Sequence, residues 1–135
     1  MQIIKSCDFI VDLTQGDSFS DIYGQNRFYR WTGAKALVEK TGIPLVLGPQ
    51  TYGPFFDDKV KKFAKSVIES AAIVIARDEE SKEYVESFCS KSVLSTTDLA
   101  FMLPYKKADI GVQSKIRIGI NPSGLLCRNK TDDSS

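Results

Sequence analysis

The sequence predicts an α/β protein built on a parallel, Rossmann-like sheet with crossover helices. Short continuous apolar runs alternate along the chain with longer segments in which apolar residues recur at helical spacing. Polar loops rich in glycine, proline and aspartate directly follow the apolar runs. The order strand, helix, strand, helix is typical of a parallel sheet whose crossover connections are right-handed.

The first part of the chain predicts two strands separated by a helix. Residues 8–13 predict a buried strand, and residues 25–41 predict a helix that ends at Gly42, because glycine is common just past a helix terminus. Residues 43–47 form a short apolar run that is typical of a strand covered on both faces. The apolar side of the helix is predicted to contain Phe28, Trp31, Ala34, Leu37 and Val38.

The middle of the chain predicts two further helices and two further strands. Residues 57–71 and the segment after Asp78 predict helices, with Asp57 and Asp78 as their N-caps. Residues 72–76 predict a third buried strand, and residues 92–95 a weaker fourth. The residues expected to be buried on the two helices are Val60, Phe63, Ala64, Val67, Ile68, Ala71, Tyr84, Val85 and Phe88.

The composition changes after residue 104, which predicts a division of the chain. We expect an incomplete N-terminal Rossmann-like domain at residues 1–104 and a polar linker at residues 105–115. Residues 116–127 alternate like a strand followed by a turn, as the start of a second domain that the chain does not complete. Residues 128–135 are polar and are expected to be a disordered tail.

The composition excludes several classes of function. The net charge of +1 indicates no nucleic-acid partner, and no apolar run approaches the length of a transmembrane helix. The chain has three cysteines at wide spacing and no histidine, so we predict no zinc site and no histidine-based catalysis.

Dinucleotide and nucleotide-phosphate motifs are absent, and we predict no cofactor. Free thiols favour a cytoplasmic location, and Cys89 is expected to be a core residue.

Four loops that follow the predicted strands contain the candidate site residues. In a parallel sheet these loops lie along one edge, where open α/β folds bind ligands, although each loop also fits an ordinary turn. We considered a magnesium site at Asp12, Asp17 and Asp21, but their irregular spacing argues against it and we predict no metal. The candidate binding residues are Gly16, Asp17, Ser18, Gln50, Tyr52, Gly53, Arg77 and Asp98.

Arg77 is the candidate for binding an anion. Its guanidinium group follows a buried strand and precedes a helix N-terminus, and both features favour a carboxylate or a phosphate. The alternative is an ion pair with Asp78, Glu79 or Glu80. The residues of the chain leave both possibilities open, and they identify no catalytic residue.

Five motifs in order resemble the polysaccharide pyruvyl transferase family over residues 8–126. They begin at Gly16, Leu47, Ala76, Asp98 and Ile118, and read GDSFSD, LGPQTYGPF, ARDEES, DLAF and IGINPSGL. The resemblance implies one half of a GT-B-like enzyme with two Rossmann-type domains and a cleft between them. Members of this family are longer than this chain, and a catalytic histidine is expected in the part that the chain lacks.

The resemblance also implies a reaction and its partners. A pyruvyl group passes from phosphoenolpyruvate to a sugar hydroxyl as a ketal, during biosynthesis of a cell-surface polysaccharide. The acceptor is a lipid-linked or nucleotide-linked glycan, and the protein is cytoplasmic or peripheral at the inner membrane face, with a homo-oligomer possible. By this resemblance Asp17, Ser18 and the loop from Gln50 to Gly53 line the cleft, and Arg77 contacts the donor.

Two alternatives remain beside pyruvyl transfer. One is a glycosyltransferase-like protein that uses a nucleotide sugar in the same cleft. The other is a sugar-binding or anion-binding module without catalytic activity, because this chain alone contains only part of the expected cleft.

Overall fold

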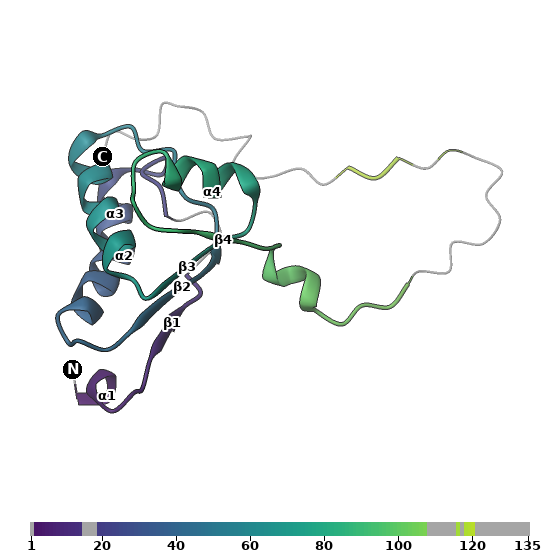
Figure 1. The fold of residues 1–135 in the computed structure, drawn as a ribbon. Coiled ribbons are helices and arrows are strands. Elements are labelled where there is room, and N and C mark those ends of the chain that lie inside the picture. The colour runs from purple at the N-terminus through teal and green to yellow at the C-terminus, as the bar shows by residue number, and fades with distance from the viewer. Residues whose placement is uncertain (1, 15–18, 108–115, 117, 121–135) are drawn as a thin grey trace. The chain divides into compact units, whose positions relative to one another are not determined.

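The computed structural model describes residues 2–14, 19–107, 116 and 118–120. The chain separates into two units, Met1–Leu103 and Pro104–Ser135. All described helices and strands lie in the first unit (Figure 1).

The first unit is an α/β fold with a four-stranded parallel sheet in the order β1-β2-β3-β4. This confirms the predicted Rossmann-like class. A short helix, α1, precedes the sheet, and a 3-10 helix, η1, follows it. The elements are α1 (Gln2–Lys5), β1 (Ile10–Asp12), α2 (Gln25–Glu39), β2 (Leu45–Gln50), α3 (Asp58–Ser70), β3 (Ile73–Ala76), α4 (Glu79–Glu86), β4 (Leu94–Ser95) and η1 (Leu99–Met102).

The helices cover one face of the sheet because the strand order runs in a single direction. Each crossover moves to the next strand on the same side, and crossovers of one hand then place their helices on one face. Figure 1 shows α2 and α3 on one side of the strands. Leu47 and Val74, which point to the covered face, are almost fully buried.

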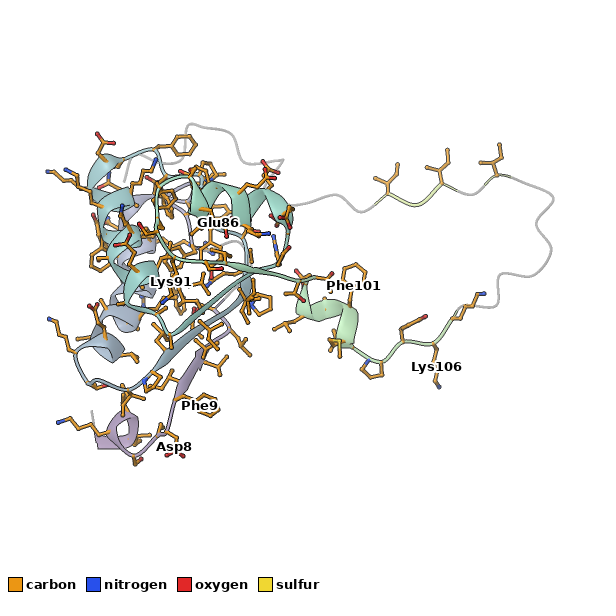
Figure 2. The ribbon with its side chains drawn as sticks, viewed as in Figure 1. Asp8, Phe9, Glu86, Lys91, Phe101 and Lys106 are labelled. Atoms are coloured by element: carbon orange, nitrogen blue, oxygen red, sulfur yellow. The ribbon has the colours of Figure 1, made fainter. Side chains whose placement is uncertain are left out.

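The opposite face of the sheet is apolar, and the described residues of the first unit do not cover it. The register pairs Val11 with Val46 and Val46 with Ile73, so these side chains lie on one face. Val11, Ile73 and Leu94 are 47%, 43% and 56% exposed. Phe9, labelled in Figure 2, points away from α2 and α3. The prediction that the second strand is covered on both faces therefore holds on the helix side only.

The buried face of α2 differs from the predicted one. Phe28 and Val38 are buried as expected, but Trp31 and Leu37 are 39% and 51% exposed, and Ala34 is exposed. Thr32 and Lys35 lie inside instead. This orientation of the helix brings Lys35 to the carboxylate of Asp12 on β1.

The ends of the helices largely follow the predicted signals. The Asp57 side chain accepts hydrogen bonds from the backbone N–H groups of Lys59 and Val60, at 2.8 and 3.1 Å. Asp78 accepts one from Ser81 at 2.7 Å. Both residues are therefore N-caps as predicted. Gly42 has a φ of +74° just after α2, a conformation that favours glycine.

The second strand extends further than its apolar run. We predicted residues 43–47, whereas β2 spans Leu45–Gln50 and includes part of the predicted loop. The pairing with β3 shifts register between Leu47 and Gln50, and Gln50 then pairs with Ala76. This irregularity accommodates Gly48 and Pro49, which a sequence pattern places in a turn.

The described residues of the second unit, 104–107, 116 and 118–120, contain no helix or strand. Ile116, Ile118 and Ile120 are more than four-fifths exposed. The strand predicted at the start of residues 116–127 falls partly on residues that the structure does not describe, so it stays a prediction. The proposed domain boundaries stay predictions.

Candidate functional site

A buried ion pair joins α2 to the carboxyl end of β1. Lys35 Nζ lies 3.2 Å from Asp12 Oδ2 and 3.2 Å from Thr14 Oγ1, and it stands 5.4 Å from the centre of the Phe19 ring. The Lys35 and Asp12 side chains are only 5% and 12% exposed. Burial lowers the pKa of Lys35, and the Asp12 carboxylate opposes this shift only in part. The sequence prediction missed Lys35 because lysine is usually exposed, although its spacing of seven residues from Phe28 and three from Val38 places it on their face of the helix.

The loops after β1 and β2 are joined to each other by backbone contacts. Asp21 accepts hydrogen bonds from the N–H groups of Phe56 and Asp57, at 2.9 to 3.1 Å. Ser20 Oγ donates to the Pro54 carbonyl at 2.7 Å, and the N–H of Gly53 donates to the Phe19 carbonyl at 2.9 Å. These contacts hold the two loops together without a ligand.

Phe19 anchors this junction in the core. Its ring is 1% exposed and makes edge-to-face contacts with Phe28, Tyr52 and Phe55. Aromatic pairs of this geometry contribute about 0.5–1.5 kcal/mol beyond their area of burial. The described part of the motif that begins at Gly16 therefore serves as scaffold.

Gln50 and Tyr52 are both about 2% exposed at the end of β2. The Tyr52 hydroxyl accepts a hydrogen bond from Gln50 Nε2 at 3.2 Å and donates to the Ile75 carbonyl at 3.3 Å. Burial raises the pKa of Tyr52 well above its usual value, and the Asp12 charge adds to this shift. Tyr52 is thus engaged within the core, whereas Gln50 Oε1 has no hydrogen-bond partner among the described residues.

Arg77 lies at the carboxyl end of β3 and forms an accessible ion pair. Its Nη1 donates to Asp98 Oδ2 at 2.9 Å, and its Nε lies 3.9 Å from Asp78 Oδ2. Asp98 also accepts a hydrogen bond from the N–H of Ala100 at 2.8 Å, and so caps η1. The side chains of Arg77 and Asp98 are 28% and 42% exposed. The structure thus joins two of the predicted site residues, from the ends of β3 and β4.

A pocket of about 250 Å³ lies between the loop after β2 and the start of α4. Gly53, a predicted site residue, is one of its lining residues and has a φ of +73°. A Cβ at Gly53 would stand 2.2 Å from the Tyr84 ring, so the glycine is required for this packing. The lining residues are Thr51, Tyr52, Gly53, Pro54, Asp78, Glu80, Ser81 and Tyr84.

The remaining candidates of the first loop, Gly16, Asp17 and Ser18, lie outside the described residues. Asp12 and Asp21, which we considered as magnesium ligands, are occupied by Lys35 and by backbone N–H groups. Among the described residues no group of three or more acidic, cysteine or histidine side chains is placed to hold a metal ion.

These features define a class: an α/β protein whose polar side chains gather at the carboxyl edge of a parallel sheet, where open α/β folds bind ligands. The family model for polysaccharide pyruvyl transferase matches residues 1–132 of the 135 residues. The chain therefore belongs to the polysaccharide pyruvyl transferase family. No curated protein matches the chain significantly, and no solved structure does so.

None of the described helices is long and apolar enough to cross a membrane.

Proposed function

We propose that this chain takes part in transferring a pyruvyl group from phosphoenolpyruvate to a sugar hydroxyl, and that Arg77 binds the anionic donor. Family membership supports the reaction class. The accessible Arg77 guanidinium at the carboxyl end of β3 is the observation that carries the assignment of the donor site.

The reaction requires cationic groups around the donor. Protonation of the methylene carbon of phosphoenolpyruvate makes its central carbon electrophilic, and a sugar hydroxyl attacks this carbon. Loss of inorganic phosphate and attack by a second hydroxyl close the ketal, with two hydroxyl protons released. The donor carries a carboxylate and a phosphate, so guanidinium groups stabilise both the bound donor and the departing phosphate.

Arg77 meets this requirement through its position and its partners. Asp98 and Asp78 hold the guanidinium from two sides, which orients it without enclosing it. A phosphate or carboxylate that binds there contacts the N–H groups that these aspartates leave available. On binding, the donor therefore replaces one of the aspartates at the Arg77 guanidinium or shares it with them. We expect Asp98 to hold the Arg77 side chain in position.

The proton donor of the reaction is not assigned to a residue. The chain contains no histidine, so within it only a carboxyl group, tyrosine, lysine or cysteine can transfer protons. Tyr52 and Cys89 are poor candidates for the proton donor, because burial raises the pKa of both side chains. The pKa of Cys89 rises to about 11.

A cytoplasmic location, with the acceptor glycan at the inner membrane face, belongs to the same proposal.

Calorimetric titration with phosphoenolpyruvate tests the donor site. We expect Arg77→Ala to weaken binding about tenfold or more, since a charged hydrogen bond contributes about 1.5–3 kcal/mol. Lys82→Ala is the matched control, because the Lys82 side chain is also 28% exposed and paired with a carboxylate, that of Glu79. If Arg77→Ala binds phosphoenolpyruvate with unchanged affinity, Arg77 is not part of the donor site.

Phosphate release in the presence of sugar acceptors tests the reaction itself. Release that depends on both phosphoenolpyruvate and a sugar supports pyruvyl transfer. Binding of phosphoenolpyruvate without release indicates a binding module. Tighter binding of a nucleotide sugar than of phosphoenolpyruvate indicates a glycosyltransferase-like function.

A further inference from the structure

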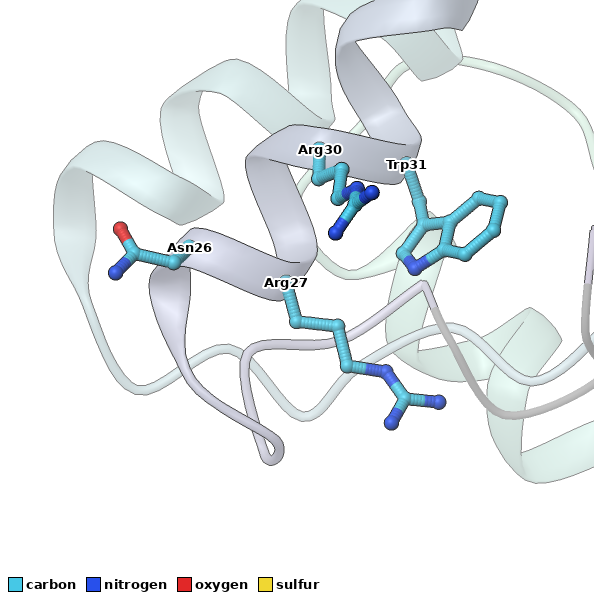
Figure 3. Close-up of a pocket in the computed structure, with 4 residues that line it drawn as sticks. All are labelled: Asn26, Arg27, Arg30 and Trp31. Atoms are coloured by element: carbon cyan, nitrogen blue, oxygen red, sulfur yellow. The ribbon is translucent and has the colours of Figure 1, made fainter. Parts of the chain in front are cut away.

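The outer face of α2 carries a hollow that the donor site does not use. It measures about 460 Å³ and is lined by Asn26, Arg27, Arg30 and Trp31. These residues share one side of the helix because residues three and four apart are neighbours on its surface. Figure 3 shows the side chains of Arg27, Arg30 and Trp31 extending toward the same hollow. None of the four lines the pocket at Gly53.

The hollow is cationic. Arg27 is held by the Tyr23 ring, whose centre lies 4.8 Å from the guanidinium carbon. No hydrogen bond or ion pair of Arg30 with another described residue is present, and its side chain is exposed. None of the described residues that line the hollow is acidic. The Arg30 guanidinium therefore faces solvent without a carboxylate partner among the described residues, and the positive charge of Arg27 lies beside it.

The hollow also has an apolar wall with polar groups at its margin. Trp31 is 39% exposed although it is a large apolar side chain, and its indole offers a flat surface together with one N–H donor. Asn26 supplies an amide that both donates and accepts hydrogen bonds. A sugar ring presents an apolar face of C–H groups and hydroxyl groups at its edge, so a sugar with an anionic substituent matches all of these features.

We propose that this hollow binds an anionic sugar, a pyranose that carries a phosphate or a carboxylate. The Arg30 guanidinium contacts the anionic group, because its planar fork matches the oxygens of phosphate and carboxylate, and the nearby positive charge of Arg27 adds to the attraction. The Trp31 indole stacks on the apolar face of the ring, and Asn26 contacts ring hydroxyls. If pyruvyl transfer is the function, the site would hold the acceptor glycan, but the binding itself does not depend on that reaction.

Tryptophan fluorescence tests this proposal directly, because Trp31 is the single tryptophan of the chain. We expect titration with glucose 6-phosphate or glucuronic acid to change Trp31 fluorescence saturably. The relative affinities of these two ligands distinguish a phosphate from a carboxylate as the bound anion. The neutral analogue methyl glucoside should bind at least tenfold more weakly. Inorganic phosphate should also bind more weakly than glucose 6-phosphate.

Substitutions in the hollow test whether the anionic sugar binds to these residues. Arg30→Ala should weaken the binding of the anionic sugar about tenfold, since charged hydrogen bonds contribute about 1.5–3 kcal/mol. Lys40→Ala, which removes an exposed positive charge just after α2, should leave it unchanged. Trp31→Phe is followed by calorimetry and should weaken binding of the sugar more than binding of inorganic phosphate.

Two results would overturn the proposal: the absence of a saturable response to both anionic sugars, or equal affinities for inorganic phosphate and glucose 6-phosphate. Arg77→Ala separates this proposal from the donor site. We expect that variant to keep the full change in Trp31 fluorescence with the anionic sugar even if it no longer binds phosphoenolpyruvate. The proposal for the hollow and the proposal for the donor site can therefore be contradicted independently.

Discussion

The Lys35–Asp12 and Arg77–Asp98 ion pairs both lie at the carboxyl edge of the sheet, and they differ in their exposure to solvent. Lys35 and Asp12 are 5% and 12% exposed at the β1 end, whereas Arg77 and Asp98 are 28% and 42% exposed at the β3 and β4 ends. The first pair is enclosed by Thr14 and the Phe19 ring.

The difference in exposure indicates that the Lys35–Asp12 pair supports the fold and that the Arg77–Asp98 pair is accessible to a ligand. A buried charge that loses its partner is costly, so Lys35 and Asp12 hold each other and join α2 to β1. An exposed pair contributes little to stability and exchanges partners readily, which leaves Arg77 available to a ligand. Charge at the carboxyl edge of a sheet therefore indicates a site only where solvent, and hence a ligand, can reach it.

The largest expected effect comes from breaking the buried pair. Lys35→Ala leaves the Asp12 carboxylate buried without its cation, and we expect the free energy of unfolding to fall by about 3–5 kcal/mol. Urea denaturation measures this change, with Lys40→Ala as a control for loss of one positive charge. The double variant Lys35→Met/Asp12→Leu should recover much of the loss. A fall below about 1 kcal/mol in Lys35→Ala would contradict the scaffold role.

A second, intermediate effect is the pH dependence of the same pair. Because burial lowers the pKa of Lys35 below its ordinary value of 10.5, the unfolded chain holds this proton to higher pH than the folded chain. The stability contributed by Lys35 should therefore increase as the pH rises from the folded pKa toward 10.5.

Urea denaturation at a series of pH values measures this, as the difference between the native chain and Lys35→Met. Taking the difference cancels the opposite alkaline effects of Tyr52 and Cys89, whose pKa values burial raises. A difference that stays constant up to the ordinary lysine pKa would show that burial does not shift Lys35.

The smallest expected effect is on the accessible pair. Arg77→Ala should change the free energy of unfolding by about 0–1 kcal/mol, because solvent screens the partly exposed pair. The same denaturation experiment compares it directly with Lys35→Ala. A loss as large as that of the Lys35 variant would place Arg77 in the scaffold, and the donor assignment would then lose its support.

The local signals of the chain predicted much of the fold. The apolar face of α3 includes Val60, Val67 and Ile68 as expected, and Asp57 and Asp78 cap their helices as expected. Arg77 and Asp98 were both predicted at the functional edge, and the structure shows that they bind each other. Helical periodicity failed on α2, where Thr32 and Lys35 are buried and Trp31 is exposed, because the pattern treats polar side chains as outward-facing.

The order of the strands and crossover helices, the helix caps and the placement of polar loops at the ends of the strands follow from local sequence, because these features depend on residues close together in the chain. Which charges meet depends on the tertiary fold. Lys35 finds Asp12, Arg77 finds Asp98, and Asp21 holds the backbone at Phe56 and Asp57. These partners are brought together by the packing of whole elements, and burial then decides whether each charge stabilises the fold or remains available to a ligand.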